Sequence, residues 1–150
     1  MRCPLCRHSD SRVVDSRASE DGAVIRRRRE CLACKQRFTT TESAALFVLK
    51  RSGTLEPFSR AKVVAGLAKA CQGRPVSTDD LERLAQQVEE TIRATGAAQV
   101  ETGEIGRTIL EPLKELDVVA YLRFASVYSA FNSLEDFESA IASLRKERRA

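Results

Sequence analysis

The first 34 residues of this sequence contain four cysteines, and their spacing limits the possible folds more than any other feature. They form two Cys-x-x-Cys pairs, Cys3 with Cys6 and Cys31 with Cys34, separated by 24 residues. Each pair can turn tightly enough to direct two sulfur atoms to one point, and two pairs complete the tetrahedral thiolate set of a structural zinc site. The spacing therefore predicts one structural zinc ion per chain, bound by all four cysteines.

A catalytic metal and a redox pair are the other uses that such cysteines have. A catalytic metal needs an open coordination position, which four thiolates do not leave, and neither pair lies in the βαβ pattern typical of a redox Cys-x-x-Cys. Disulfides are disfavoured, because the N-terminus lacks the apolar core of a secretory signal and we expect a cytoplasmic protein. His8 is interpreted as a surface residue that could help to contact an anion, and Cys71 as a small apolar residue of a helix interior.

The segment between the two cysteine pairs has the pattern of a β-hairpin. Arg12–Val14 and Ala23–Arg27 are strand-like, and Ser19–Gly22 has the residue types of a turn. Residues 38–45 are interpreted as a short connection to the rest of the chain. A segment this small has too little core to fold alone, so the metal should supply much of its folding free energy.

The excess of basic residues is confined to the first third of the chain. Residues 1–45 hold 10 Lys and Arg against 6 Asp and Glu, whereas residues 46–150 hold 15 against 15. Arg26–Arg29 lead directly into the second cysteine pair, and alternation along a strand would place two of these four arginines on one face. A basic surface held on a metal-fixed scaffold suits the phosphates of nucleic acid, although a solvated charge run remains the alternative and charge does not separate DNA from RNA. The candidate contacts are Arg12, Arg17, Arg26, Arg27, Arg28, Arg29, Lys35 and Arg37.

The remaining residues predict an apolar strand that begins at Ala45, followed by a run of helices. Ser59, Ser77, Asp117 and Ser133 have the residue types and positions of helix N-caps, and Gly73 and Gly96 those of stop signals. Pro112 is expected to kink the third helix. The fold class predicted is α+β, with a small β zinc ribbon and a mainly helical domain that contains a short β-hairpin or strand. The helical segments are 59–73, 77–96, 102–116, 117–131 and 133–149.

Three cations converge where the apolar strand meets the first helix. Lys50 and Arg51 end the strand, and Lys62 lies one turn into the helix that follows, which together make a suitable anion site. Ordinary surface charge is the alternative reading. The sequence has no Walker loop, no Gly-x-Gly-x-x-Gly motif and no nucleophile–His arrangement, so it predicts no enzyme. No apolar run approaches the roughly 20 residues that span a bilayer, so no membrane partner is expected.

The motifs "MRCPLC" and "RRRRECLACKQRFTT" resemble the N-terminal zinc ribbon of the NrdR family, bacterial transcriptional repressors of ribonucleotide reductase genes. The motifs "VLKRSG" and "VAYLRFASVYSAF" look like an ATP-cone, the regulatory domain also found in ribonucleotide reductases. The resemblance covers nearly the whole chain in the order and length of the family. It implies a DNA-binding ribbon at 1–45, a nucleotide-binding ATP-cone at 46–136 and a C-terminal helix end with a basic tail at 137–150.

The family's nucleotide site carries over residue by residue. The resemblance implies ATP and dATP as allosteric ligands, with Mg²⁺, and a cationic trio that holds the triphosphate. Glu56 would bond sugar hydroxyls, since a carboxylate repels phosphate unless Mg²⁺ intervenes. Ser52 departs from the Asp or Asn that the family more often has, which bears on the local turn. The implied nucleotide-binding residues are Val48, Lys50, Arg51, Glu56, Ser59, Lys62, Tyr121, Arg123 and Tyr128.

Three functions compete at this point. The first is a repressor that binds double-stranded operator DNA of ribonucleotide reductase genes, with its DNA binding and homo-oligomeric state controlled by ATP and dATP. The second is a zinc-ribbon accessory protein that binds RNA or the transcription machinery, with the helices as a docking platform. The third is a nucleotide-handling enzyme. Nucleotide-dependent retention on specific duplex DNA would favour the first, and turnover of bound nucleotide the third.

Overall fold

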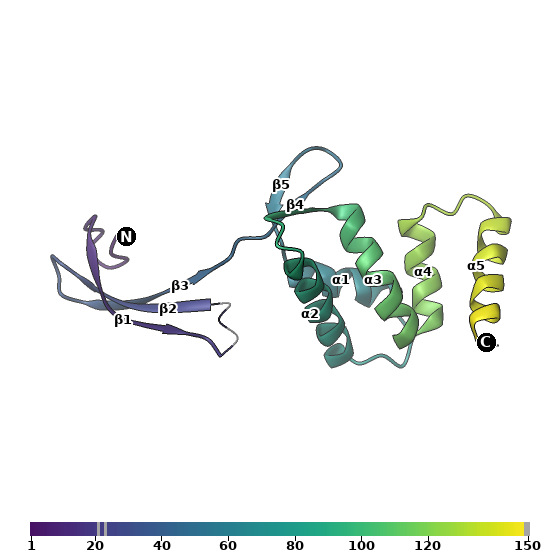
Figure 1. The fold of residues 1–150 in the computed structure, drawn as a ribbon, viewed down its shortest axis with the longest axis horizontal. Coiled ribbons are helices and arrows are strands. Elements are labelled where there is room, and N and C mark those ends of the chain that lie inside the picture. The colour runs from purple at the N-terminus through teal and green to yellow at the C-terminus, as the bar shows by residue number, and fades with distance from the viewer. Residues whose placement is uncertain (21, 23, 149–150) are drawn as a thin grey trace. The chain divides into compact units, whose positions relative to one another are not determined.

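The computed structural model describes residues 1–20, 22 and 24–148, which divide into two compact units, Met1–Ala45 and Leu46–Ala150 (Figure 1). We call them the ribbon unit and the helical unit. Asp21 of the expected turn, Ala23 at the expected start of the second strand and the last two residues of the basic tail lie outside the described residues.

The ribbon unit is a three-stranded antiparallel sheet with its second strand in the centre. Its strands are β1 (Ser11–Ala18), β2 (Val24–Cys31) and β3 (Arg37–Ser43). The expectation that residues 38–45 form a connection was wrong, because most of that segment is β3. Thr39, Thr40 and Thr41 are β-branched and suit a pleated strand, and the ladder to β2 gives their backbone groups partners.

The helical unit combines a small mixed sheet with five helices. The central strand β4 (Phe47–Leu49) pairs antiparallel with β5 (Leu55–Pro57) and parallel with β6 (Gln99–Glu101). The predicted α+β class is confirmed. The helices are α1 (Arg60–Ala70), α2 (Thr78–Ala94), α3 (Thr102–Leu116), α4 (Val118–Tyr128) and α5 (Leu134–Glu147).

Short polar side chains begin four of the five helices, as the sequence predicts. The side chains of Ser59, Ser77, Asp117 and Ser133 each accept a hydrogen bond from a backbone N–H three residues later. These bonds satisfy donors that the first helical turn leaves without partners. Gly73 and Gly96 follow α1 and α2 with φ values of 75° and 74°, the left-handed backbone that stops a helix. Pro112 lies inside α3, which runs on to Leu116.

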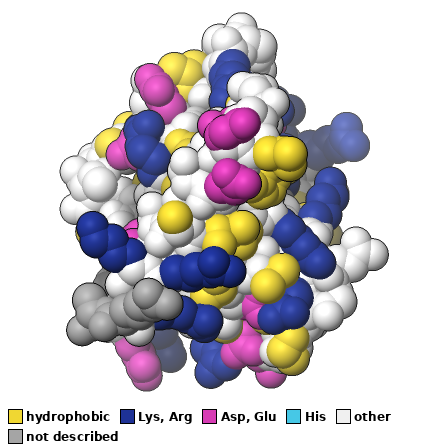
Figure 2. Space-filling view, turned by 90° about the vertical axis from the view of Figure 1, so that its right-hand side faces the viewer, with side chains coloured by type: hydrophobic (Ala, Val, Ile, Leu, Met, Phe, Trp, Pro, Cys, Tyr) yellow, Lys and Arg dark blue, Asp and Glu magenta, His cyan; other side chains and the backbone are white. Residues whose placement is uncertain are grey.

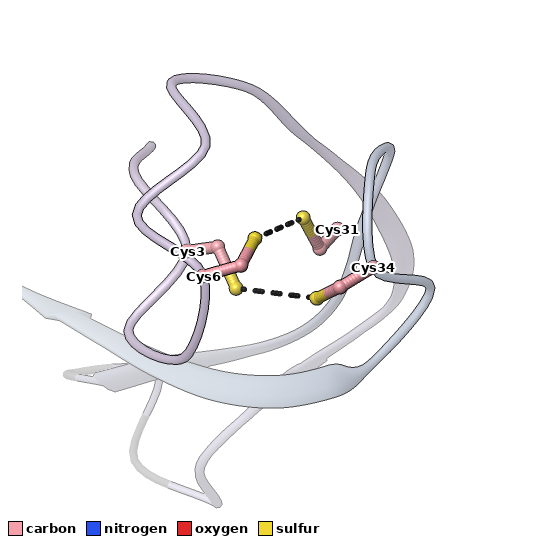
Figure 3. Close-up of side chains that lie close together, drawn as sticks. All are labelled: Cys3, Cys6, Cys31 and Cys34. Atoms are coloured by element: carbon pink, nitrogen blue, oxygen red, sulfur yellow. Dashed lines mark hydrogen bonds between the residues drawn. The ribbon is translucent and has the colours of Figure 1, made fainter.

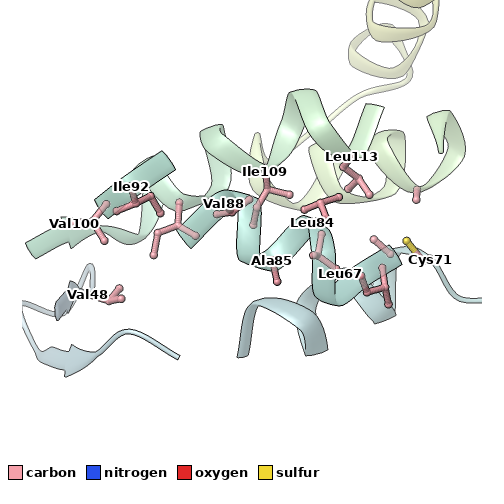
Figure 4. Packing of buried hydrophobic residues seen from close by; sticks show 14 of the residues in the cluster. Val48, Leu67, Cys71, Leu84, Ala85, Val88, Ile92, Val100, Ile109 and Leu113 are labelled. Carbon is pink, nitrogen blue, oxygen red and sulfur yellow. The ribbon is translucent and has the colours of Figure 1, made fainter. Parts of the chain in front are cut away.

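The core of the helical unit lies between α1, α2 and α3 and extends to the sheet (Figure 4). Leu67, Val88 and Leu113, one from each helix, are fully buried. Burial of each such side chain stabilises the fold by roughly 1.5–3 kcal/mol. Val48 of β4 and Val100 of β6 join the same cluster, so the core fixes the sheet against the helices. Cys71, as expected, belongs to this core.

The surface on the α5 side carries basic, acidic and hydrophobic side chains interspersed (Figure 2). This mixture agrees with the balanced charge of residues 46–150. Among the described residues, no helix has both the length and the apolar character needed to cross a membrane.

Candidate functional site

The four N-terminal cysteines lie together, with their sulfur atoms within 4.8 Å of one another (Figure 3). Cys3 Sγ lies 3.8 Å from Cys34 Sγ, and Cys6 Sγ lies 3.5 Å from Cys31 Sγ. A zinc ion about 2.3 Å from each of four tetrahedral sulfurs would set those sulfurs about 3.8 Å apart. The donor type and the spacing therefore fit a closed zinc site, and the expected grouping of the four cysteines is confirmed.

Both cysteine pairs are closed by the same backbone turn. Arg7 and Lys35, each following the second cysteine of a pair, have φ values of 61° and 58°. The Arg7 N–H donates to the Cys3 carbonyl oxygen at 3.0 Å, and the Lys35 N–H to that of Cys31 at 3.1 Å. The left-handed backbone costs a non-glycine residue roughly 1–2 kcal/mol. The same conformation at both pairs directs two sulfur atoms of each pair toward the common cluster.

The thiols of this cluster do not ionise independently. The backbone N–H of Cys34 is the main cause that lowers the pKa of the Cys31 thiol to about 6. The pKa of the Cys34 thiol is raised to about 12: the backbone N–H of Gln36 lowers it, but burial and the sulfurs of Cys6 and Cys31 raise it more. Four thiolates this close repel one another, and a bound divalent cation removes that repulsion.

The arginines of β2 divide between the two faces of the sheet. Arg26 and Arg28 are exposed, and their side chains form no hydrogen bond or ion pair with another described residue. Arg27 and Arg29 lie on the opposite face and are partly buried. Arg27 Nε donates to Glu42 at 3.2 Å, and Arg29 Nε donates to Thr40 at 3.1 Å. The expected division of the arginine run into two and two is therefore observed.

Three further arginines share the face of Arg26 and Arg28. Directly paired residues of an antiparallel sheet project to the same side, and the ladders pair Arg17 with Arg26 and both Arg12 and Arg37 with Glu30. Arg12 and Arg17 are five residues apart and would face opposite sides of a regular strand. A β-bulge at Val14 restores the common side. We call this surface the arginine face; it consists of Arg12, Arg17, Arg26, Arg28 and Arg37.

Glu30 lies within the arginine face, and the sequence interpretation did not identify it. It is the buried charged residue among those described, at 8% exposure. Its carboxylate accepts from Arg12 Nη2 at 2.7 Å and from Arg37 Nε at 3.3 Å. The hydrogen bond from Arg12 is the main cause that lowers the pKa of Glu30. The available signal was a lone acid between an arginine run and a metal-binding cysteine.

The helical unit contains a pocket of about 610 Å³ between the sheet, α1, α3 and the end of α4. It brings together seven of the nine predicted nucleotide-binding residues from four separate elements and the loop after β4. The size lies within the roughly 300–1,000 Å³ of small-molecule sites. The seven residues are Val48, Lys50, Arg51, Glu56, Ser59, Lys62 and Tyr128.

One end of this pocket is cationic and ordered by Glu56. Its carboxylate bonds Lys50 Nζ at 2.8 Å and Lys62 Nζ at 3.0 Å. The hydrogen bond from Lys50, followed by that from Lys62, lowers the pKa of Glu56. With Arg51 nearby, three cations and one carboxylate leave a net charge of +2. Ser59 caps α1 beside them, so the positive end of the helix dipole adds to an anion site.

The other end of the pocket is apolar, and sequence reasoning missed most of it. Tyr128 donates its hydroxyl hydrogen to the Gly103 carbonyl oxygen, and its ring covers Gly106. Phe124 and Tyr128 lie nearly parallel, with ring centroids 6.2 Å apart. A pocket with cations at one end and flat apolar groups at the other suits a ligand that joins an anionic group to an aromatic ring.

Two predicted nucleotide-binding residues do not line the pocket. Arg123 Nη1 donates to the carbonyl oxygen of Gln72 at 2.6 Å and to that of Ala70 at 3.3 Å, which satisfies the end of α1. The Tyr121 ring packs against the core and lies 5.9 Å from Lys114 Nζ. Both side chains hold helices together in this structure.

Comparison with known families identifies both units. Residues 1–42 match the family model described as the N-terminal domain of NrdR-like transcriptional repressors. Residues 46–134 match the ATP cone domain. The expected combination of a zinc ribbon with a nucleotide-binding ATP-cone is confirmed by these matches and by the cysteine cluster.

Several proteins named as the transcriptional repressor NrdR are similar over nearly the whole chain. One from Beutenbergia cavernae is 70% identical over 148 residues, which cover 99% of this chain and 87% of that protein. One from Frankia casuarinae is 69% identical over 147 residues, 98% of this chain and 81% of that protein. One from Leifsonia xyli is 67% identical over 149 residues, 99% of this chain and 95% of that protein. The relatives are named as regulators rather than enzymes, in agreement with the sequence prediction.

Proposed function

The chain belongs to the NrdR family of transcriptional repressors, and on this premise we propose that it represses ribonucleotide reductase genes by binding their operator DNA. The ribbon unit contacts the duplex, and ATP or dATP in the helical unit controls that contact. A repressor of this kind acts in the bacterial cytoplasm, where its DNA is.

The observation that carries the DNA-binding proposal is the arginine face. Arg26 and Arg28 are exposed on a sheet that the cysteine cluster holds at one end. Arginines on a rigid strand lose less side-chain entropy on binding phosphate than arginines in a loop. Release of counterions from DNA then supplies much of the affinity, and the contacts that reach base edges supply sequence preference. Lys35, exposed in the second cysteine turn, adds a phosphate contact.

The nucleotide proposal rests on the pocket of the helical unit. Lys50, Arg51 and Lys62 bind the triphosphate, together with Mg²⁺, and the apolar end accommodates the adenine ring. Glu56 holds two of these cations, and it is placed to turn toward sugar hydroxyls when phosphate oxygens replace it on the lysines. Loss of the 2′-hydroxyl in dATP would change that contact, which gives the site a means to distinguish the two nucleotides.

Control of DNA binding requires that a nucleotide bind two states of the protein with different affinity. A change of homo-oligomeric state provides such a pair of states, because repeated operator sequences require ribbons at a fixed spacing. Val127 at the end of α4 and Leu134 at the start of α5 are 83% and 79% exposed. These apolar side chains make α4 and α5 the expected contact between copies.

The test measures retention on duplex DNA and solution mass in parallel, with no nucleotide, ATP, dATP and both. The duplex is first selected from a random library with the purified protein. We expect one nucleotide condition to combine tight DNA binding with one mass, and another to combine weak binding with a different mass. Equal retention on random duplex in all four conditions would contradict the proposal, and preferential retention on single-stranded RNA would favour an accessory role.

A further inference from the structure

We propose that Glu30 is a specificity-determining positioning residue of the ribbon unit, which holds Arg12 and Arg37 in the geometry that recognises operator DNA. This inference rests on the proposed DNA-binding function and concerns how that surface distinguishes its operator from random DNA. Glu30 is an acidic residue within the arginine face, where a negative charge by itself would oppose DNA binding.

The geometry is a carboxylate held between two guanidinium groups across all three strands. The ladders align Arg12 of β1, Glu30 of β2 and Arg37 of β3 in one row. The carboxylate uses one oxygen for each arginine, at 2.7 Å and 3.3 Å. The Glu30 side chain is 11% exposed, whereas those of Arg12 and Arg37 are 65% and 55% exposed. The acid is therefore covered, and the two arginines keep most of their surface for a partner.

This arrangement restricts how the two arginines can meet DNA. A free arginine adapts its long side chain to any phosphate, and such adaptable contacts bind all sequences alike. A guanidinium fixed by a carboxylate has a defined direction, and it binds well only where the base edge or phosphate matches that direction. Arg26 and Arg28 have no such partner among the described residues, so they supply the contacts that are independent of sequence.

The same carboxylate reduces binding to random DNA. It cancels one positive charge of the five-arginine surface, which lowers the number of counterions released. Specificity is a difference between two affinities, and a group that weakens the unwanted complex raises it as effectively as one that strengthens the wanted complex. Glu30 acts in both ways, through the direction of the two arginines and through charge.

Three full-length variants separate charge from position: Glu30→Gln, Glu30→Asp and the control Glu42→Gln. Glu42 is exposed and forms an ion pair with Arg27 on the opposite face of the sheet. Glu42→Gln alters the net charge by the same amount as Glu30→Gln. Binding is measured over a salt series to the duplex selected with the wild-type protein and to a scrambled duplex. Zinc content is measured in each sample.

We expect Glu30→Gln to bind scrambled duplex more tightly and with a steeper salt dependence, because a negative charge is removed. Its preference for the selected duplex over the scrambled one should fall about tenfold, which is the contribution of one well-placed base contact. Glu30→Asp keeps the charge but shortens the side chain, so it should lose preference without binding scrambled duplex more tightly. Glu42→Gln should keep the preference. In a variant lacking both Arg12 and Arg37, the further change Glu30→Gln should not alter the preference.

An unchanged preference in both Glu30 variants that retain zinc would overturn the proposal. Loss of zinc by Glu30→Gln leaves Glu30→Asp as the deciding variant, and loss of zinc by both would show that Glu30 serves folding instead. These outcomes are distinct from failure of the proposed function, because in that case the wild-type protein itself would show no preference for any selected duplex.

Discussion

The ring of Tyr128 lies directly over Gly106, in the space that a β-carbon on that glycine would occupy. The glycine therefore allows the end of α4 to approach α3 and to form the apolar end of the pocket. The Tyr128 hydroxyl also donates a hydrogen bond to the carbonyl oxygen of Gly103, which lies one turn before Gly106 on α3.

We expect Gly106→Ala to displace the Tyr128 ring, to weaken nucleotide binding at least tenfold and to lower the free energy of unfolding by about 1–3 kcal/mol, the usual cost of overpacking. Gly66→Ala is the matched control for stability, because a β-carbon there meets nothing within 4 Å and alanine favours the helix by up to about 1 kcal/mol. Thermal unfolding compares both variants with the wild type, and nucleotide titration compares Gly106→Ala with the wild type. A Gly106→Ala protein as stable as the wild type would contradict this packing.

Metal binding should depend on Cys31 and not on Cys71. Cys31→Ser is expected to release zinc and to unfold the ribbon unit, because metal binding supplies much of the folding free energy of a small ribbon. Cys71→Ala, a change in the core of the helical unit, should keep one zinc ion per chain. Zinc released by a thiol reagent is measured for each purified variant, and full zinc content in Cys31→Ser would refute the assignment.

The arginines of β2 should differ in their contribution to DNA binding. Arg26→Ala and Arg28→Ala should each reduce the slope of log affinity against log salt by about 1, because each removes a phosphate contact. Arg27→Ala and Arg29→Ala should change the slope less, since these side chains already bond Glu42 and Thr40. Fluorescence anisotropy over a salt series measures the slope. Equal slopes for all four variants would show that the two faces of the sheet contribute equally to phosphate contacts.

Lys62 should be required for the nucleotide response. Lys62→Ala removes one of the two cations bonded to Glu56 and should weaken triphosphate binding at least tenfold, so that solution mass no longer depends on ATP or dATP. Lys69→Ala, on the exposed last turn of the same helix, is the control and should behave as the wild type. Zinc content should stay the same in both. A mutant that still changes mass with nucleotide would place the triphosphate elsewhere.

The stability of the helical unit should fall in acid through Asp117. Burial raises the pKa of this carboxyl group, but the Ala120 N–H and the Arg74 guanidinium lower it more, so its net pKa lies below the usual value. A group with a lowered folded-state pKa contributes stability above its unfolded-state pKa of about 3.9, and this contribution is lost as the pH falls through the folded-state value.

Asp117→Asn should therefore lower the free energy of unfolding by about 1.5–3 kcal/mol at pH 7, because asparagine still caps α4 but loses the charge-assisted bond to Arg74. The difference from the wild type should shrink below pH 4. Urea unfolding at pH 7, 5 and 3 measures it, and a difference that stays constant over this range would exclude a charged Asp117 as the cause.

The helices could be predicted from sequence because their signals are local. An N-cap residue type directly precedes four of the helices, and each of these caps is observed: Ser59, Ser77, Asp117 and Ser133. Residues 55–57 and 99–101 are too short for any period to be visible, and their strands exist because β4 pairs with them. Strand pairing is non-local, and for the same reason residues 38–45 were interpreted as a connection although most of them form β3.

Site residues could be predicted from sequence where the residue type itself indicates a function, such as metal binding or anion binding. The cysteine spacing and the cations Lys50, Arg51 and Lys62 are visible as residue types. Glu30 and Gly106 were missed, because their importance arises from what lies opposite them in space. Arg123 was placed in the nucleotide site by its family motif, whereas its guanidinium bonds the end of α1.

The bulge at Val14 makes the arginine face tolerant of one particular change in length. Because Val14 has no partner in the ladder while Val13 pairs with Arg29 and Asp15 with Arg28, deletion of that residue would leave a regular strand with every other pairing unchanged. A chain one residue shorter there would keep the same arginines on one face of the sheet. Residues 15–17 are all paired with β2. A deletion there would either move Arg17 to the other face of the sheet or change the residue of β2 with which it pairs. Gaps in natural relatives should therefore be accepted at the bulge and rejected two residues later.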